Sequence, residues 1–287
     1  DTAAGRWVLA SANMNNTGAT LTLGQTTTGP LYVLGDSTIN GGTLSAPGWT
    51  GLVVQQSFVR LNNLTANTNI LVLPSMGMSL SGTVTVNGVV TLNPNSGISG
   101  ASQGSTVTVG AGEFVLNGTP AQPTIMGGVG FQSLSTFTLG PLVNIHGGAG
   151  RIFSGTLSRT ILQGTITAEV PGAPISINTI NFDHQGTLQA INGGTLNCTY
   201  APNLEPTPAN FHPRGTLKPD SDSFISSTGW IHCAATTTLA YDLNEPLANH
   251  TIITAAGDFQ ANGTLRVRLK SGYAPAAGDS WRLFSGS

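Results

Sequence analysis

A three-residue unit, glycine then threonine then a branched apolar residue, recurs along the chain and limits its possible folds more than any other feature. It occurs at Gly42-Thr43-Leu44, Gly82-Thr83-Val84, Gly155-Thr156-Leu157, Gly164-Thr165-Ile166, Gly186-Thr187-Leu188, Gly194-Thr195-Leu196, Gly215-Thr216-Leu217 and Gly263-Thr264-Leu265. The steps of 22 residues from Gly164 to Gly186 and of 21 residues from Gly194 to Gly215 suit a solenoid rung of roughly 20 to 25 residues. Glycine would form the corner, threonine would start a strand, and the branched residue would point inward.

We therefore predict an all-β fold, a β-solenoid in the form of a right-handed parallel β-helix. Other steps between units are irregular, at 8, 9 and 48 residues. In a chain with 38 glycines, chance alone could also produce such a repeated unit. A β-sandwich or several small β-domains therefore stay open as alternatives. The Asn87-Gly88 pair does not decide between them, because it suits both a type I′ hairpin turn and a solenoid corner.

Composition excludes several classes of protein. Only 8% of residues are charged, against roughly 25% in an ordinary soluble domain, but 39% are apolar and they alternate with polar residues, which argues against disorder. No stretch approaches the roughly 20 consecutive apolar residues of a membrane-spanning helix, so we expect no membrane insertion. The net charge of −2 and the absence of a basic stripe indicate that nucleic acid is not a partner.

The proline content changes near residue 200. Pro202, Pro206, Pro208, Pro213 and Pro219 fall within 25 residues, and proline cannot donate to a central strand ladder. We therefore predict a β-solenoid over residues 1–200, a Pro-rich loop or linker over 201–228, and a C-terminal β module over 229–287 that continues or caps the solenoid.

The C-terminal segment carries a family-like pattern. It includes Gly229-Trp230-Ile231-His232, then Asn262-Gly263-Thr264-Leu265-Arg266-Val267-Arg268-Leu269, Gly272-Tyr273-Ala274-Pro275 and Gly278-Asp279-Ser280-Trp281-Arg282-Leu283-Phe284. Over residues 229–284 the chain resembles exported bacterial β-solenoid surface proteins, namely autotransporter-passenger-like proteins and C-terminally sorted repeat proteins. His250-Thr251 stands where those proteins carry an acidic residue. The resemblance implies a secreted, cell-surface, non-catalytic scaffold.

Catalytic and metal-binding candidates are few. Asp183 and His184 are adjacent, so in a strand they point to opposite faces and cannot share chemistry. Asp220 and Asp222 place two carboxylates on one side of an extended segment, which could hold calcium, although we expect a solvated loop. The histidines have no metal-ligand spacing, and we predict no cofactor; they are His146, His184, His212, His232 and His250.

The two cysteines, Cys198 and Cys233, allow two interpretations. They could form one disulfide in an oxidising compartment, or they could be two buried free thiols.

The hypothesis that follows is an extracellular structural protein, the subunit of a surface layer, fibre or filament. A solenoid has two open ends, and we expect self-association through strand edges there, at Trp7, Val8 and Leu9 and at Trp281 and Leu283. One alternative is a surface adhesin or polysaccharide-binding domain, which predicts a row of exposed aromatic side chains. A further alternative is a β-helix polysaccharide lyase or hydrolase, which predicts clustered carboxylates and basic residues.

Overall fold

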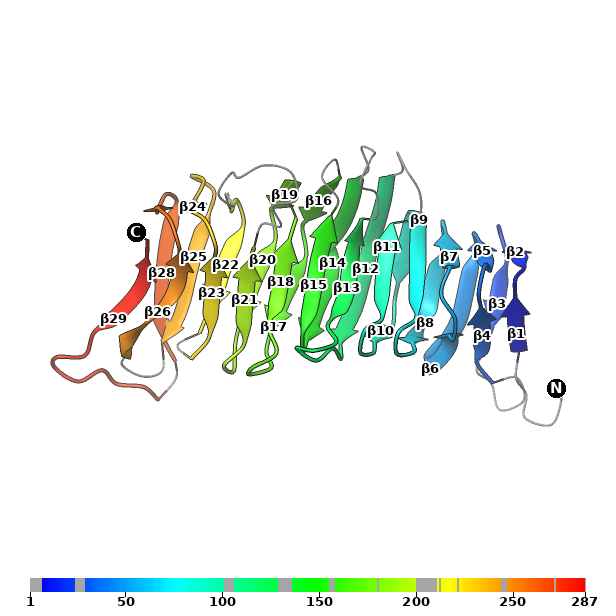
Figure 1. Ribbon diagram of the computed structural model, residues 1–287, viewed down its shortest axis with the longest axis horizontal. Coiled ribbons are helices and arrows are strands. Elements are labelled where there is room, and N and C mark those ends of the chain that lie inside the picture. Colours follow the sequence, from blue (N-terminus) through cyan, green and yellow to red (C-terminus); the bar gives the residue numbers. More distant parts are fainter. Residues whose placement is uncertain are drawn as a thin grey trace.

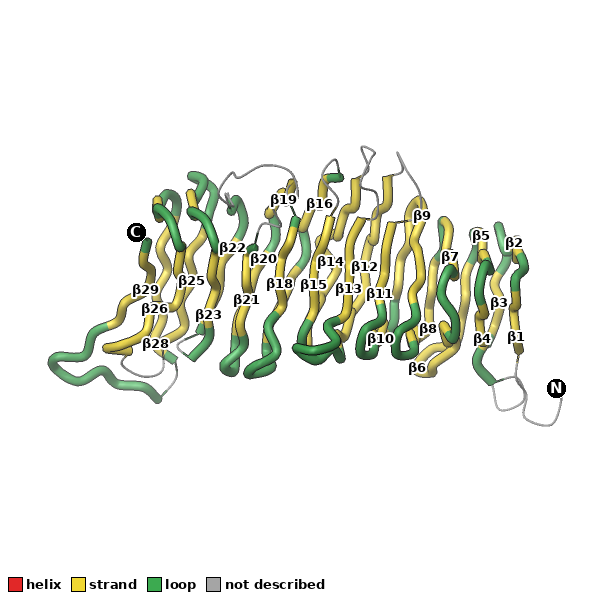
Figure 2. The backbone as a smooth tube through the Cα atoms, viewed as in Figure 1, coloured by secondary structure: helices red, strands yellow, loops and turns green. Residues whose placement is uncertain are grey.

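The computed structural model describes residues 7–23, 29–100, 106–128, 136–154, 158–179, 181–199, 211, 213–220, 222–243, 247–270 and 272–286. In these residues every regular element is a strand, and neighbouring strands pair in parallel to form an elongated β-solenoid (Figures 1 and 2). The predicted all-β solenoid is confirmed, and the sandwich alternative is excluded.

Each rung of the solenoid visits three faces in the order A, B, C. Face A contains β1 (Trp7–Ala10), β4 (Leu31–Leu34), the C-terminal parts of β6 (Thr43–Val54), β8 (Thr65–Val72), β12 (Thr106–Leu116) and β14 (Thr136–Gly147), and then β10 (Val89–Leu92), β17 (Thr165–Ala168), β20 (Thr187–Ala190), β22 (Thr216–Pro219), β25 (Thr238–Leu243) and β28 (Thr264–Leu269).

Face B contains β2 (Asn13–Asn15), β5 (Thr38–Asn40), β7 (Val59–Asn62), the N-terminal part of β9 (Gly77–Val86), β11 (Gly97–Gly100), β13 (Thr124–Gly128), β15 (Gly150–Ser154), β18 (Ile175–Asn178), β21 (Thr195–Cys198), β23 (Phe224–Ser227), β26 (Leu247–Ala255) and β29 (Trp281–Ser285). Face C contains β3 (Thr20–Thr22), β16 (Arg159–Leu162), β19 (Asn181–His184), β24 (Ile231–His232) and β27 (Phe259–Gln260), together with the remaining parts of β6, β8, β9, β12 and β14.

The core is built from columns of inward side chains, one from each rung. On face A, Ile166, Leu188, Leu217 and Leu239 stand opposite one another in successive strands, and each is at most 2% exposed. Alternate residues of a strand point to opposite sides, so the threonine before each of these residues faces outward. Because each rung buries its apolar side chains against the rungs above and below, stacking is what creates the core.

The glycine corners are explained by close backbone contact. A Cβ atom added to Gly186 would lie 2.0 Å from the carbonyl oxygen of Gly164, and one added to Gly215 would lie 2.1 Å from that of Gly186. Both distances are far inside van der Waals contact, so only glycine fits while the rungs keep their spacing.

The irregular spacing of the repeated unit also has a structural cause. Gly186 precedes face A strand β20, whereas Gly194 precedes face B strand β21, so their 8-residue step joins two corners of one rung. The expected rung from Gly194 to Gly215 is therefore wrong, because those glycines lie on different faces. The true step from Gly186 to Gly215 is 29 residues. Gly155-Thr156-Leu157 lies outside the described residues.

Polar side chains form ladders on the outside of the stack. The amide of Asn87 donates to the Asn67 side chain at 2.7 Å, and the Thr199 hydroxyl donates to Asn178 at 2.6 Å. Asn87-Gly88 connects β9 to β10, which pair with other rungs and not with each other, so this pair forms a solenoid corner. A Cβ atom on Gly88 would lie 2.4 Å from the Thr68 carbonyl oxygen.

The interval 201–228, expected as a loop or linker, is not a break in the stack. Strands β22 and β23 lie within it and pair with the rungs on both sides. Pro219 is the last residue of β22; the pairing of β22 with β25 stops before it, at Leu217 and Leu239, and resumes beyond it as the isolated Asp220–Asp242 bridge. Residues 201–210 lie outside the described residues. From residue 229 onward, β24 to β29 continue the three faces, so the C-terminal segment continues the solenoid.

Candidate functional site

The C-terminal end of the described solenoid exposes a row of apolar side chains whose register partners in the preceding rung point into the core. On β28, Leu265, Val267 and Leu269 are 54%, 45% and 47% exposed. Their register partners on β25 are Leu239, Tyr241 and Leu243, each at most 3% exposed. The same column is therefore buried one rung earlier and open to solvent on β28, where no described strand lies beyond it.

Face B ends on β29 with the two residues predicted from the sequence. Trp281 and Leu283 are partly buried and pack against the core. The carbonyl oxygen of Leu283 accepts a hydrogen bond of 3.2 Å from the Tyr241 hydroxyl. Phe284 is 39% exposed and stacks on Phe259 with ring centroids 4.7 Å apart. The two predicted residues thus pack β29 against the core, and the more exposed apolar residues lie on β28, the last described strand of face A.

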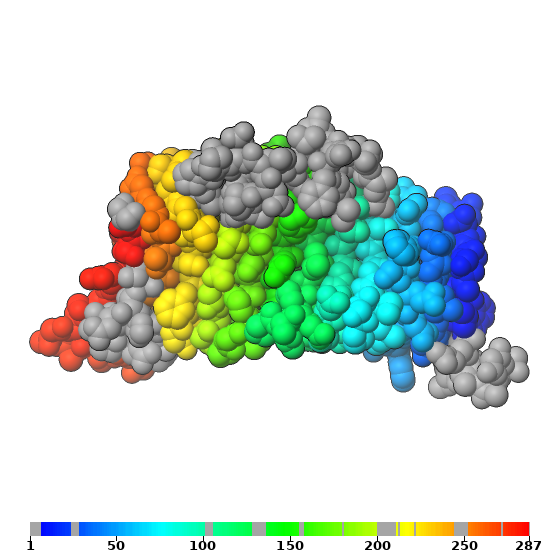
Figure 3. All heavy atoms as spheres, in the orientation of Figure 1, coloured from blue at the N-terminus to red at the C-terminus, as the bar shows by residue number. Residues whose placement is uncertain are grey.

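The N-terminal end shows the matching arrangement. Trp7 and Leu9 on β1 stand over Leu31 and Val33, which are buried, so they occupy the inward column of face A. Trp7 is 48% exposed and Leu9 is partly buried, while Val8 points outward and is 55% exposed. The two ends lie at opposite extremes of the elongated body, blue and red in Figure 3.

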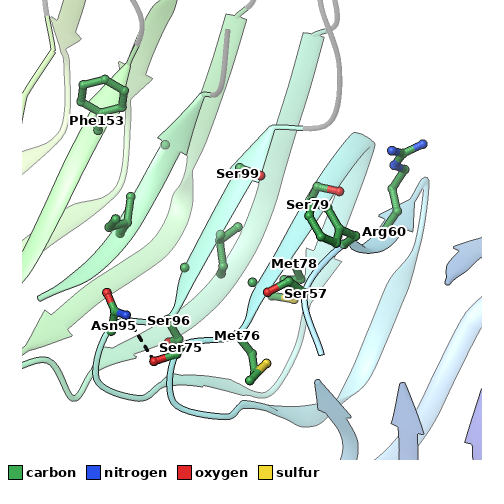
Figure 4. A pocket seen from close by; sticks show the side chains of 16 residues that line it. Ser57, Arg60, Ser75, Met76, Met78, Ser79, Asn95, Ser96, Ser99 and Phe153 are labelled. Atoms are coloured by element: carbon green, nitrogen blue, oxygen red, sulfur yellow. Dashed lines mark hydrogen bonds between the residues drawn. The ribbon is translucent and has the colours of Figure 1, made fainter. Parts of the chain in front are cut away.

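A groove crosses face B between β7 and β15, and has a volume of about 360 Å³ (Figure 4). Arg60 stands at one side of the groove and Phe153 at the other (Figure 4), and Phe58, two residues before Arg60, also lines it. Ser79 and Ser99 lie between them. We call this depression the face B groove; its full lining is Ser57, Phe58, Arg60, Ser75, Met76, Gly77, Met78, Ser79, Asn95, Ser96, Gly97, Ile98, Ser99, Ile125, Gly127 and Phe153.

An imidazole bridges two carboxylates across face A. His146 Nδ1 lies 2.7 Å from Glu169 Oε1, and His146 Nε2 lies 3.0 Å from Glu113 Oε1. Burial alone would lower the pKa of His146, but hydrogen bonds and charge from Glu169 and Glu113 raise it above its usual value. The arrangement ties three rungs together through one imidazole ring.

The Asp183–His184 pair behaves as the alternation predicts. The Asp183 carboxylate accepts from the Arg159 guanidinium on the outside of face C. His184 is fully buried and forms a triangular cluster with Phe182 and Phe211, whose ring centroids lie 6.1 and 5.8 Å from its own and 6.4 Å from each other. Burial lowers the pKa of His184 to about 4, and among the described residues its ring nitrogens have no hydrogen-bond partner of normal geometry. This histidine is a neutral core residue, cut off from Asp183.

The Asp220–Asp222 segment differs from the expected solvated loop. Asp220 is only 5% exposed, accepts from the Asn192 backbone N–H at 3.2 Å, and lies 3.5 Å from the Lys270 ammonium. Burial and the neighbouring Asp222 raise the pKa of Asp220, and the hydrogen bond shared with Asp220 lowers that of Asp222. Lys218 and Asp242 form a second ion pair at 3.4 Å beside them. The cluster joins three rungs through two ion pairs, Lys218–Asp242 and Asp220–Lys270.

Cys198 and Cys233 are both buried and free, so the structure shows the thiol alternative and not the disulfide. Burial raises the pKa of Cys198 to about 12 and that of Cys233 to about 11. At neutral pH both are protonated core side chains with little nucleophilic character.

Among the described residues there is no group of three or more His, Cys, Asp or Glu side chains that could hold a metal ion. His212 lies outside that part of the chain. The part of the chain that the structure describes contains no helix long and apolar enough to cross a membrane.

Sequence reasoning missed Leu265, Val267 and Leu269 at the end and the whole face B groove. Leu265 belongs to the Gly263-Thr264-Leu265 unit, whose sequence is the same as that of units in buried rungs, and Val267 and Leu269 continue its alternation along β28. A scan against protein-family models and searches of curated proteins and of solved structures each found no match to this chain.

Proposed function

We propose that this protein is an extracellular structural protein whose solenoids stack end to end into a fibre, filament or surface layer. The observation that carries the proposal is the open inward column on β28, where Leu265, Val267 and Leu269 remain about half exposed. On every interior rung of face A the corresponding column is covered by the next strand. A second copy that places β1 against β28 would supply that strand.

Strand direction determines how two copies would meet. Because the rungs pair in parallel throughout, the two ends of the solenoid are different surfaces. Contact between them is heterologous, head to tail, and does not close on itself by symmetry. Faces A, B and C would each run on from one copy into the next, which predicts a polar filament and excludes a closed dimer.

The energy of such a contact has two sources. Covering the exposed half of each apolar side chain on β28 would contribute on the order of 1 kcal/mol per residue. The backbone N–H and C=O groups at the free edge of β28 would also form hydrogen bonds with β1 in place of water, as in strand addition. Association opposes this with a loss of translational and rotational freedom, so assembly should depend on protein concentration.

The extracellular part of the proposal is supported by composition and by the C-terminal resemblance. Charged side chains make up only 8% of the chain, and the outer surface uses Thr, Ser and Asn ladders instead. A scaffold that depends on stacked ladders needs few ion pairs.

The test is electron microscopy together with sedimentation velocity over a range of protein concentrations. The double variant Leu265→Asp/Val267→Asp places two charges in the open column and should abolish filaments. Val170→Asp is the matched control, because Val170 is 38% exposed at a corner in the middle of the stack. Unassembled wild-type protein at every concentration, or filaments formed equally well by the double variant, would show that the ends do not stack.

A further inference from the structure

The floor of the face B groove is made of very small outward side chains. Gly77 stands opposite Gly97, and Ser79 stands opposite Ser99, in the paired strands β9 and β11. Toward the N-terminus the next strand brings Arg60, and toward the C-terminus come Ile125 and then Phe153. The distance from the rung of Arg60 to that of Phe153 is four strand spacings, roughly 19 Å. The groove is thus a trough along the solenoid axis with large side chains at both ends.

Gly77 has no structural reason to be glycine. Its backbone is outside the left-handed region, and an added Cβ atom would meet only the Gly97 carbonyl oxygen, at 3.7 Å. By contrast, a Cβ atom on Gly127 would overlap the Phe153 backbone. Glycine inside a strand weakens it and often marks the close approach of a ligand. Glycine at position 77 therefore leaves open space above the outer face of β9, and the packing of the strand does not require it.

Phe58 is held in an unfavourable conformation at the rim of the groove. Its φ is +70°, and its side chain is 74% exposed. The same corner has positive φ in other rungs, at Asp36, Ser75 and Asn95, so what distinguishes this corner is a bulky aromatic residue where the others carry small polar ones. Because the Phe58 ring is exposed, it contributes little to the stability of the hydrophobic core. Two independent features, the unneeded glycine and the exposed aromatic residue, therefore mark one location.

The charge of the groove indicates the sign of its ligand. Arg60 is the only charged residue among its lining residues. Arg60 is exposed and has no ion pair with any acidic side chain in the described part of the chain. A guanidinium binds a carboxylate through two parallel hydrogen bonds. The groove therefore suits a ligand that carries carboxylate groups.

The rest of the lining distinguishes a sugar from a peptide. Strands β9 and β11 have paired neighbours on both sides, so a peptide cannot add to them as a strand. The exposed aromatic ring can instead stack on the C–H face of a sugar ring, and the hydroxyls of Ser79 and Ser99 can bind ring hydroxyls.

We propose that the face B groove binds an acidic glycan. A short run of uronate residues lies over Gly77 and Gly97 between Phe58 and Phe153, with one carboxylate on Arg60. No carboxyl or imidazole group is among the lining residues, so the groove binds the chain and does not cleave it. The site lies on the side of the solenoid, so it remains accessible whether or not copies stack at their ends.

The experiment is calorimetric titration of the full chain with tetragalacturonate, with a neutral galactose tetrasaccharide and a tetraglutamate peptide as comparison ligands. Tetragalacturonate should bind, and at least tenfold more tightly than either comparison. Arg60→Gln should weaken binding about tenfold, the effect of losing one charged hydrogen-bonding group, and should reduce its dependence on salt.

Gly77→Leu is the decisive variant. It fills the trough at a position where the backbone tolerates a side chain, so binding should fall more than tenfold while the unfolding temperature is kept. Ser176→Leu is the matched control, because Ser176 occupies the same outward column of face B, on β18 beyond the groove.

Three results would overturn the proposal. Wild-type protein could fail to bind tetragalacturonate, Gly77→Leu could bind it as well as Ser176→Leu does, or tetraglutamate could bind equally well. The last result would identify the groove as a site for acidic peptides.

Discussion

Leu188 and Leu265 are the same residue of the same repeated unit in the same column of face A, but their surroundings are opposite. Leu188 is completely buried, whereas Leu265 is 54% exposed. The column runs from Leu188 through Leu217 and Leu239 to Leu265 in continuous register. The only difference is that a further strand lies beyond β20 and none of the described strands lies beyond β28.

This difference separates two properties that are combined in most folds. The alternation of apolar and polar residues determines which side of the strand a side chain occupies. Burial depends on whether a neighbouring rung is present to cover it. In a solenoid the interior rungs should therefore be intolerant of change, and the end rungs should respond mainly through assembly.

The largest effect is expected at the glycine corners. Gly186→Val should prevent folding or cost about 4 kcal/mol or more, because its Cβ atom would lie 2.0 Å from the Gly164 carbonyl oxygen with rungs on both sides. The Cβ atom of Gly263→Val would lie 2.2 Å from the Thr237 carbonyl oxygen, and valine would be strained at the φ of +93°, but only the β28 rung has to move, so the loss should still be smaller. Urea denaturation monitored by circular dichroism measures both. Equal losses would contradict the difference between interior and end rungs.

The paired leucines themselves provide the next test. Leu188→Ala should destabilise the protein by about 2–5 kcal/mol, since it leaves a cavity in the core. Leu265→Ala should cost under about 1 kcal/mol in dispersed protein, because half of the side chain is already in water. Denaturation at low protein concentration gives the two values. The Leu265 variant should then raise the concentration needed for assembly.

Buried His184 predicts a dependence of stability on pH. The unfolded chain takes up a proton below about pH 6.5, but burial holds the folded pKa of His184 near 4. The free energy of unfolding should therefore fall as pH drops from about 6.5 to 4, by up to about 3 kcal/mol, and then level off.

His184→Phe isolates this contribution, because a phenyl ring has a similar shape, does not titrate and joins the aromatic cluster with Phe182 and Phe211. The variant should lose that part of the slope in a series of thermal melts. The raised pKa of His146 acts at higher pH, where its ion pairs are lost as pH rises through the folded pKa. An unchanged slope in the variant would show that His184 is not the group responsible.

The smallest effect is expected from the polar ladders. Asn87→Ala removes the 2.7 Å hydrogen bond to Asn67 between interior rungs and should cost about 1 kcal/mol. Asn13→Ala on β2 changes an exposed residue of the first described rung and should stay within about 0.5 kcal/mol. Thermal melts resolve this difference, and a larger loss at Asn13 would reverse the expected order.

Part of the candidate site could be predicted from the sequence. Trp7, Leu9, Trp281 and Leu283 were predicted as end-strand residues from the pattern of strands, and they lie on β1 and β29. The face B groove could not be predicted, because Gly77, Gly97, Phe58 and Phe153 are as far as 95 residues apart in the chain. Only the register between rungs places them together.

The sequence by itself determined the fold class and the side of each strand that faces inward. The alternation of apolar and polar residues and the glycine corners are local properties, so they can be recognised within a few residues of sequence. The tertiary structure decided which glycines belong to one column, that β22 and β23 lie inside the stack, and that Cys198 and Cys233 stay apart. Each of these depends on how many residues a rung contains, and the rungs differ in length because corners accept insertions without disturbing the strands.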